Sequence, residues 1–251
     1  FYLRPHQSGN PDANQYCPVI SRTASWQLYY GEGYSAPVKY PFDQWFHVRL
    51  VVSGRQMEVY VGDLETPALF VSDLKRVPRP GGLALESFLG EARFANFSFR
   101  NEANPPMKGK PTPPAPTPPG TVMAWQVSGS FSEKKLENAL HLTRAEKDSL
   151  TWTPATPEPT GLLNLASVTP WSRERNTAFA RLVIDSDRQQ TKKLDFGFSD
   201  RARVYLNDRL LFSGHDEFVS RDYRFLGTIG YYDTVYLPLK RGRNELWIAV
   251  S

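Results

Sequence analysis

The sequence has only one cysteine, Cys17, among its 251 residues, so it can form no internal disulfide. It also lacks any apolar run near the roughly 18 residues of a membrane-spanning helix, and we expect no membrane insertion. Basic and acidic residues are nearly balanced, at 30 and 26, and neither sign gathers into a cluster. Because nucleic-acid-binding proteins carry clustered Lys and Arg on one face, this even spread argues against a nucleic-acid partner.

The motifs of several enzyme classes are missing as well. The sequence has no G-x-S-x-G elbow, H-E-x-x-H helix, C-x-x-C pair or Walker loop. Cys17 precedes a proline and has no adjacent base, which favours an incidental thiol over a nucleophile. A lone thiol without a disulfide framework is compatible with the cytosol and with the bacterial periplasm or surface.

What the sequence does contain is a proline-rich run, PPMKGKPTPPAPTPP, at residues 105–119, which is closed by Gly120. This run holds eight of the 21 prolines. Proline has no amide hydrogen for a helix or a sheet ladder, so the run predicts a semi-rigid extended spacer. We therefore expect a first domain at 1–100, a linker at 101–120 and a second domain at 121–251.

Many short segments of alternating apolar residues predict an all-β fold, with each domain a β-sandwich. Residues 45–61 predict a hairpin around Ser53–Gly54, with one buried face formed by Val48, Leu50, Val52, Met57, Val59 and Val61. Further strands are expected in the first domain at 1–4, 25–30, 68–72, 82–88 and 92–100. In the second domain we expect a polar helical stretch near 132–148 and strands at 124–131, 150–154, 178–185, 192–200, 202–214 and 234–251.

The first domain resembles the concanavalin A-like (laminin-G-like) jelly rolls. The resemblance rests on four segments: PFDQWFHVRLVVSGRQMEVYVGD (41–63), PALFVSDLK (67–75), GGLALESF (81–88) and FANFSF (94–99). Within that group it is most similar to bacterial domains of the family-16-like or 3-keto-disaccharide hydrolase-like type. The N-terminal strands that the resemblance implies are missing from this sequence.

The second domain resembles the galactose-binding-like jelly roll, the sugar-binding type found in family-2 glycosidases. The segments YLNDRLLFSG (205–214) and LPLKRGRNELWIAV (237–250) carry this resemblance. Asn207–Asp208 stands where Asn-Gly is usual, and both residue types tolerate the left-handed region. Since this fold also serves as an inert spacer, the resemblance implies the fold more strongly than sugar binding.

We predict a ligand surface in the N-terminal stretches 6–16 and 26–34, where aromatic rings and hydrogen-bonding side chains alternate. Rings can stack on sugars while amides and imidazoles take the hydroxyl groups. The predicted ligand-binding residues are His6, Asn10, Asn14, Gln15, Trp26, Tyr29, Tyr30 and Tyr34. The alternative is that 26–30 is the inward face of a strand and that 6–16 is an ordinary turn.

A catalytic role for the first domain is the weaker hypothesis. The family-16 resemblance implies an E-x-D-x-x-E strand, and residues 1–100 contain no such pattern. Retaining hydrolysis needs two carboxyl groups about 5–5.5 Å apart, and such a pair can also come from separate loops. The local candidates for that pair are Asp12, Glu32 and Glu86.

A second candidate site lies in the loop-rich stretch 214–233. One interpretation is a sugar site formed by Arg221, Arg224, Tyr231 and Tyr232. Another is a calcium site with oxygen ligands from Asp216, Glu217, Asp222 and Asp233, and Ca²⁺ is the only cofactor that the sequence suggests. EF-hand spacing is absent, and a solvated loop with surface ion pairs is the third interpretation.

These patterns together favour a non-catalytic, two-module protein that binds carbohydrate or another surface polymer. We expect it in the bacterial periplasm, at the cell surface or among secreted proteins. Two alternatives stay open: a glycoside hydrolase with its site in the first domain, and a structural component of a larger assembly. Because the sequence opens at Phe1 and stops at Ser251 on apparent strands, we expect both domains to be incomplete parts of a longer polypeptide.

Overall fold

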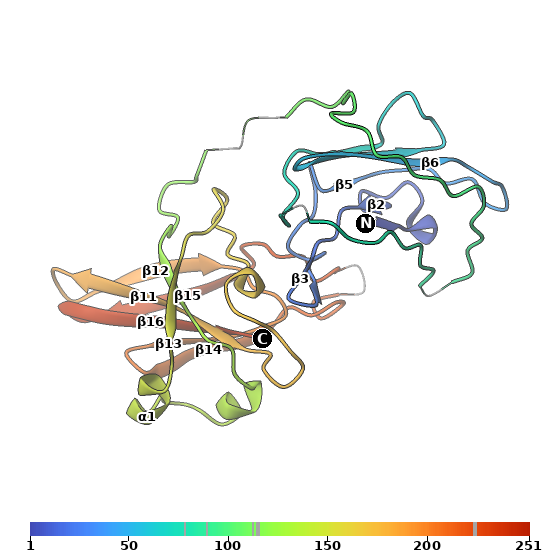
Figure 1. The fold of residues 1–251 in the computed structure, drawn as a ribbon. Coiled ribbons are helices and arrows are strands. Elements are labelled where there is room, and N and C mark those ends of the chain that lie inside the picture. The colour runs from blue at the N-terminus through green and yellow to red at the C-terminus, as the bar shows by residue number, and fades with distance from the viewer. Residues whose placement is uncertain (78, 89, 112, 114–115, 223–224) are drawn as a thin grey trace. The chain divides into compact units, whose positions relative to one another are not determined.

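The structure is a computed structural model that describes residues 1–251 except 78, 89, 112, 114–115 and 223–224. It is built from antiparallel β-sheets with a few short helices, which confirms the prediction of an all-β sandwich fold (Figure 1). The chain forms two compact units. The first unit consists of Phe1–Pro18 and Gly31–Thr112, and the second of Val19–Tyr30 and Pro113–Ser251. The boundaries drawn from the sequence at 100 and 120 stay predictions.

Residues 19–30 therefore belong to the second unit, although they lie far from it in the sequence. The Ser21 hydroxyl donates to the carbonyl of Ala166 at 2.7 Å, and Tyr29 donates to Glu158 at 3.1 Å. This segment contains the short strands β3 (Val19–Ile20) and β4 (Thr23–Ala24).

The predicted strand at 25–30 is wrong. The amides of Leu28 and Tyr29 both donate to the carbonyl of Ser25, so the backbone turns back on itself there. Alternating rings in a stretch of this length do not distinguish a strand from a turn that packs against another surface.

The first unit contains two small sheets and the 3₁₀ helix η1 (Pro5–Gln7). One sheet has the order β1 (Tyr2–Leu3), β2 (Asn14–Gln15), β5 (Ser35–Ala36). The other has the order β6 (Val48–Ser53), β7 (Gln56–Val61), β8 (Leu69–Val71). The hairpin expected at 45–61 is present, and Gly54 takes the positive φ of 56° that its turn requires.

The β6 strand has the expected alternation but not the expected burial. Its register places Val48, Leu50 and Val52 on the same face as the buried Met57 and Val59 of β7. The three β6 side chains are nevertheless 41%, 46% and 54% exposed. β6 is the edge strand of its sheet, and the core around Met57 and Val59 does not extend over it.

The strands expected at 82–88 and 92–100 do not form. These residues have no ladder partner, and Phe94, Phe97 and Phe99 are between 53% and 77% exposed. A period-two pattern indicates only that a segment is suited to a pleated sheet. The segment becomes a strand only when a partner strand is available for hydrogen bonding. None of the described residues supplies that partner.

The start of the proline-rich run is fixed to the first unit by a buried carboxylate. Glu58 on β7 is fully buried and accepts hydrogen bonds from Tyr60 Oη at 2.7 Å and from the Lys108 amide at 2.6 Å. The Gly109 amide is a third donor. Burial acts to raise the pKa of Glu58, but these hydrogen bonds outweigh it and the net pKa is lowered.

Gly109 is also fixed by shape. A Cβ at this position would lie 2.3 Å from Cγ of Phe70, so only glycine allows the backbone to lie on that ring. The linker expected at 101–120 therefore begins as a segment packed on the sheet of β6, β7 and β8.

The second unit is organised by a six-stranded antiparallel sheet. Its order is β10 (Trp152–Ala155), β9 (Trp125–Ser128), β11 (Ala178–Ser186), β16 (Gly242–Val250), β13 (Arg201–Leu206) and β14 (Arg209–His215). A two-stranded sheet of β12 (Gln190–Phe196) and β15 (Asp233–Leu239) packs on it (Figure 1). Asn207 and Asp208 join β13 to β14 with φ values of 49° and 72°, the backbone of a type I′ hairpin turn.

Alternate residues of the long strands fill two cores on opposite faces of the large sheet. On one face, Val204, Leu246 and Ile248 meet β12 and β15. On the other face, Tyr205 and Trp247 pack with residues of a covering segment that contains η2 (Glu133–Leu136) and α1 (Arg144–Asp148). A smaller cluster packs Leu165, in the 3₁₀ helix η3 (Leu165–Ser167), against β9 and β11.

We expect Glu58→Ala to lower the free energy of unfolding of the first unit by about 2–4 kcal/mol, since it leaves buried donors without an acceptor. Chemical denaturation of the full chain measures this. The matched control is Glu65→Ala, because Glu65 is highly exposed and its ion pair with Lys108 is worth roughly 0–1 kcal/mol. Equal effects of the two substitutions would contradict an anchoring role for Glu58.

Candidate functional site

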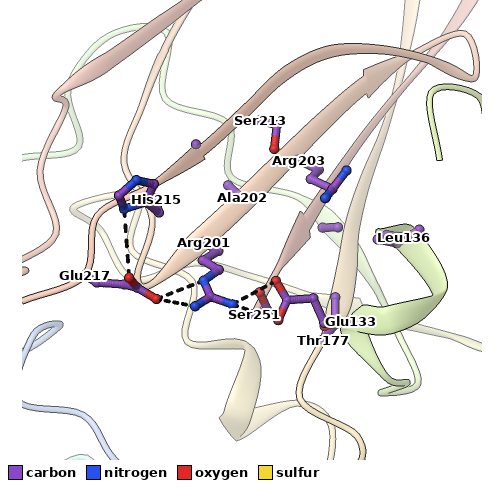
Figure 2. Close-up of a pocket in the computed structure, with 12 residues that line it drawn as sticks. Glu133, Leu136, Thr177, Arg201, Ala202, Arg203, Ser213, His215, Glu217 and Ser251 are labelled. Atoms are coloured by element: carbon purple, nitrogen blue, oxygen red, sulfur yellow. Dashed lines mark hydrogen bonds and ion pairs between the residues drawn. The ribbon is translucent and has the colours of Figure 1, made fainter. Parts of the chain in front are cut away.

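The second unit contains a pocket of about 370 Å³ beside the first residues of β13 and the last residues of β14 (Figure 2). A 3₁₀ helix, η2, and the end of β16 complete its walls. The lining residues include charged, polar and small or aliphatic ones. They are Glu133, Leu136, Thr177, Arg201, Ala202, Arg203, Ser213, His215, Glu217, Ala249 and Ser251, with Gly214 between two of them.

Arg201 occupies the middle of the polar wall, between two glutamates (Figure 2). Its Nη2 lies 2.6 Å from Oε1 of Glu217, and its Nη1 lies 3.3 Å from Oε2 of Glu133. The hydrogen bond to Glu217 raises the pKa of the Arg201 guanidinium. Because these side chains are partly exposed, each pair contributes roughly 0–1 kcal/mol, and its main effect is to fix the position of both carboxylates.

Two further groups complete the polar wall. His215 Nδ1 lies 3.9 Å from Oε2 of Glu217, beyond hydrogen-bonding distance (Figure 2). Arg203 donates to the carbonyl of Glu137 at 3.3 Å. The lining thus contains two guanidinium groups and two carboxylates, and the pocket offers both donors and acceptors with no net charge from these four groups.

The loop that follows β14 is anchored by an ion-pair cluster around a buried aspartate, Asp216. Asp216 is 1% exposed and accepts from Nε of Arg221 at 2.7 Å. The same guanidinium reaches Oδ2 of Asp233 at 2.6 Å. Burial, with a further contribution from Asp216, raises the pKa of Asp233, and hydrogen bonding to Asp216 raises the pKa of Arg221.

The backbone of residue 216 is held too, because its amide donates to the carbonyl of Asp200 at 2.6 Å. Gln27 from the N-terminal segment donates to the Asp200 side chain at 2.6 Å, and its carbonyl accepts from the Ile229 amide at 3.0 Å. Gln27 and Asp200 thereby hold this loop in place through hydrogen bonds.

Aromatic side chains project from this anchored loop toward solvent. Phe218, Tyr231 and Tyr232 are 58%, 65% and 49% exposed. The Phe218 ring meets Trp26 edge-on, with the ring centres 6.3 Å apart. The guanidinium of Arg221 lies 5.1 Å from the centre of the Tyr232 ring, so the buried cluster also positions this ring.

The residues predicted in the N-terminal stretches are divided between the two units. His6, Asn10, Asn14, Gln15 and Tyr34 lie in the first unit, and Trp26, Tyr29 and Tyr30 in the second.

In the first unit His6 and Asn10 are exposed, whereas Asn14 and Gln15 on β2 are 0% and 1% exposed. Tyr34 stacks on Tyr16 with ring centres 6.4 Å apart. Asn14 and Gln15 have no surface to offer a ligand in this conformation. The binding roles of the exposed residues stay predictions.

In the second unit Trp26 is half-buried, Tyr30 is 37% exposed, and Tyr29 is buried with its hydroxyl on Glu158. Two of the three predicted rings therefore reach the surface, and both belong to the segment that contacts the anchored loop.

The structure places the weak catalytic candidates of the first unit in different environments. Asp12 is buried, with Oδ2 3.8 Å from Nη1 of Arg4, while Glu32 and Glu86 are exposed. No hydrogen bond or ion pair joins any two of these acids in the part of the chain that the structure describes. Their action on a glycan stays a prediction.

The acids proposed as calcium ligands have other partners. Asp216 and Asp233 share Arg221, and Glu217 pairs with Arg201. Asp222 is exposed, and Arg224 lies outside the described residues. Within the described ranges, no three His, Cys, Asp or Glu side chains are grouped so as to hold a metal ion. No described helix has the length and apolarity to cross a bilayer.

Sequence reasoning missed several residues of this region. Glu133 and Arg201 are 68 positions apart, and only the sheet brings them together. The sequence does not predict a binding role for Phe218, because a single ring in a polar loop gives no periodic pattern. The adjacent His215, Asp216 and Glu217 were the one visible sign that chemistry gathers after β14.

Comparisons with known proteins place the chain in no family. No family model matches it, and no curated protein matches it. Among solved structures, the Faecalibacterium prausnitzii beta-glucuronidase aligns at 9% identity and a TM-score of 0.29. The alignment covers 51% of this chain and 20% of the enzyme. A likeness of this size carries no conclusion about fold or activity.

We expect Arg221→Met to destabilise the second unit by about 3 kcal/mol, because it leaves the buried Asp216 without its cation. Arg144→Met is the control, since Arg144 forms only an exposed i, i+4 pair with Asp148 worth roughly 0.5 kcal/mol or less. Chemical denaturation followed by tryptophan fluorescence compares them. If Arg221→Met costs no more than Arg144→Met, the cluster does not anchor the loop.

Proposed function

We propose that this protein is a non-catalytic carbohydrate-binding protein and that the second unit binds the glycan. The observation that carries the proposal is the combination found on one loop. The loop begins at His215 and Glu217, which line a charge-balanced pocket, and it goes on to exposed rings at Phe218, Tyr231 and Tyr232.

A neutral polyhydroxylated ligand suits both the pocket and the exposed rings. A hydroxyl group both donates and accepts, so it can accept from Arg201 and donate to Glu133 or Glu217. Flat rings beside fixed polar groups are the usual composition of a small-molecule site. A phosphate or metal ligand would instead call for an excess of one charge, which these four pocket groups do not provide.

Binding without catalysis is favoured by the partners of the pocket carboxylates. Glycoside hydrolysis needs two carboxyl groups that flank the scissile bond and act on it directly. Both Glu133 and Glu217 are instead held in ion pairs with Arg201.

A second candidate, a structural component of an assembly, is supported by the open apolar face of β6. Pairing two copies of β6 antiparallel about Leu50 would place Val48 opposite Val52 and Arg49 opposite Val51, so no like charges meet. Edge strands usually carry charges or bulges that prevent such pairing, and the exposed face of β6 carries none. A second copy of this chain is the partner that this pattern fits.

The carbohydrate proposal is tested by affinity electrophoresis of the full chain in gels containing neutral polysaccharides. We expect retardation in at least one gel, and Phe218→Ala and Tyr232→Ala should each weaken it about 5- to 30-fold, as the loss of 1–2 kcal/mol predicts. Tyr236→Ala is the matched control, because Tyr236 is 63% exposed on the regular strand β15. Absence of retardation, or equal effects of all three substitutions, would reject the proposal.

The assembly candidate predicts self-association in the micromolar range, measured by sedimentation equilibrium. Leu50→Lys should give a monomer, because it puts a charge in the centre of the apolar edge. Leu140→Lys makes the same change at a 66% exposed site of the second unit and should leave association unchanged. A monomeric parent chain would remove this candidate.

A further inference from the structure

The large sheet of the second unit has a row of side chains that crosses four strands on one face. Strand register places Pro154 of β10 opposite Gln126 of β9, Gln126 opposite Arg181 of β11, and Arg181 opposite Trp247 of β16. Trp247 is buried under the covering segment, whereas Gln126 and Pro154 are exposed. Arg181 therefore lies where the covered part of the sheet meets its open part.

The Arg181 guanidinium is held in a defined orientation. Its Cζ lies 3.9 Å from the centre of the Trp152 ring and 5.5 Å from that of Trp247. Its Nε donates to Oε1 of Gln126 at 3.0 Å, and Nη2 donates to the same oxygen. Stacking on an indole and bonding to an amide leave little rotational freedom, so the group is preorganised.

No carboxylate pairs directly with this cation in the part of the chain that the structure describes, although Glu245 acts on it from a longer distance. Arg181 forms no ion pair there, and its hydrogen-bond acceptor is a neutral amide. The carboxylate of Glu245 is held instead by Arg243 at 3.0 Å and Lys147 at 3.7 Å. Burial lowers the pKa of Arg181, as expected for a partly desolvated charge.

The N–H donors of Arg181 that Gln126 does not occupy indicate the class of ligand. A guanidinium has five N–H donors, and Gln126 occupies one on Nε and one on Nη2. The Nη1 and Nη2 edge keeps parallel donors, which match the two oxygens of a carboxylate. A single guanidinium without a direct ion pair fits a monoanion better than a dianion.

We propose that Arg181, positioned by Trp152 and Gln126, binds a carboxylate group of an acidic polysaccharide. That the carboxylate belongs to a saccharide rests on the proposed function, whereas the anion site itself rests only on the geometry of Arg181. The site is separate from the pocket lined by Arg201, so the two have independent tests.

The experiment measures binding of the full chain to polygalacturonate and to fully methyl-esterified pectin, which keeps the backbone and removes its charge. Arg181→Gln should weaken binding to polygalacturonate at least about tenfold and leave binding to the ester unchanged. Arg181→Lys should also lose affinity, because an ammonium keeps the charge but not the paired donors. Arg144→Gln, an equal charge change at an exposed site, should have no effect.

Three results would overturn the proposal. The first is equal binding of polygalacturonate by Arg181→Gln and the parent chain. The second is an equal loss for Arg144→Gln, or parent binding to dextran sulfate that is as tight, since both indicate general attraction to polyanions. The third is tighter binding of poly-glutamate than of polygalacturonate with the same dependence on Arg181, which would transfer the site to acidic peptides.

Two features keep the outcome interpretable. Folding of Arg181→Gln is checked by its thermal midpoint, which should fall only slightly, because the stacking on Trp152 is lost at a partly exposed site. If this variant does not fold, Arg181→Lys carries the test. Loss of neutral glycan binding in Phe218→Ala with intact polygalacturonate binding would count against the proposed function and not against the Arg181 site.

Discussion

The second unit depends on one strand, β16, which is paired along most of its length on both sides. It shares nine register pairs with β11 and five with β13, and its residues alternate between the two cores. A one-residue slip of this strand would exchange Leu246 and Ile248 with Trp247, moving each to the wrong face. The buried Asn244 fixes the preceding turn, since its side chain bonds to the Lys240 amide and carbonyl.

Both surfaces for which we propose ligand binding depend on the pairing of this strand. The register of β16 with β11 sets Arg181 beside Trp247, at the border of the covered face. Its pairing with β13 brings the first residues of β13 to the pocket, where Arg201 meets Glu133 from η2. Arg181 and Arg201 are therefore held by regular strands, and the ring of Tyr232 is positioned by the ion-pair cluster around Asp216.

The first unit buries fewer of its apolar residues in a core. Its interior is small, and a buried carboxylate, Glu58, ties the start of the proline-rich run to the sheet. Its edge strand β6 and the rings at 94–99 remain in solvent. These side chains are suited to a pleated surface, which is why the sequence pattern predicted a buried face for β6 and a strand at 92–100.

Sequence patterns by themselves determined the all-β class, the hairpin at 45–61 and the strands of the second unit, because alternation and turn residues are local properties. Asn207–Asp208 and Gly54 specify their turns through backbone preferences that need no distant partner. The tertiary structure alone decided three features. They are the assignment of residues 19–30 to the second unit, the ion pair of Glu133 with Arg201, and the position of Arg181 on Trp152 and Gln126. Each feature depends on which residues distant in the sequence become neighbours in the fold. Burial and ion pairing are properties of that three-dimensional arrangement and not of a local pattern.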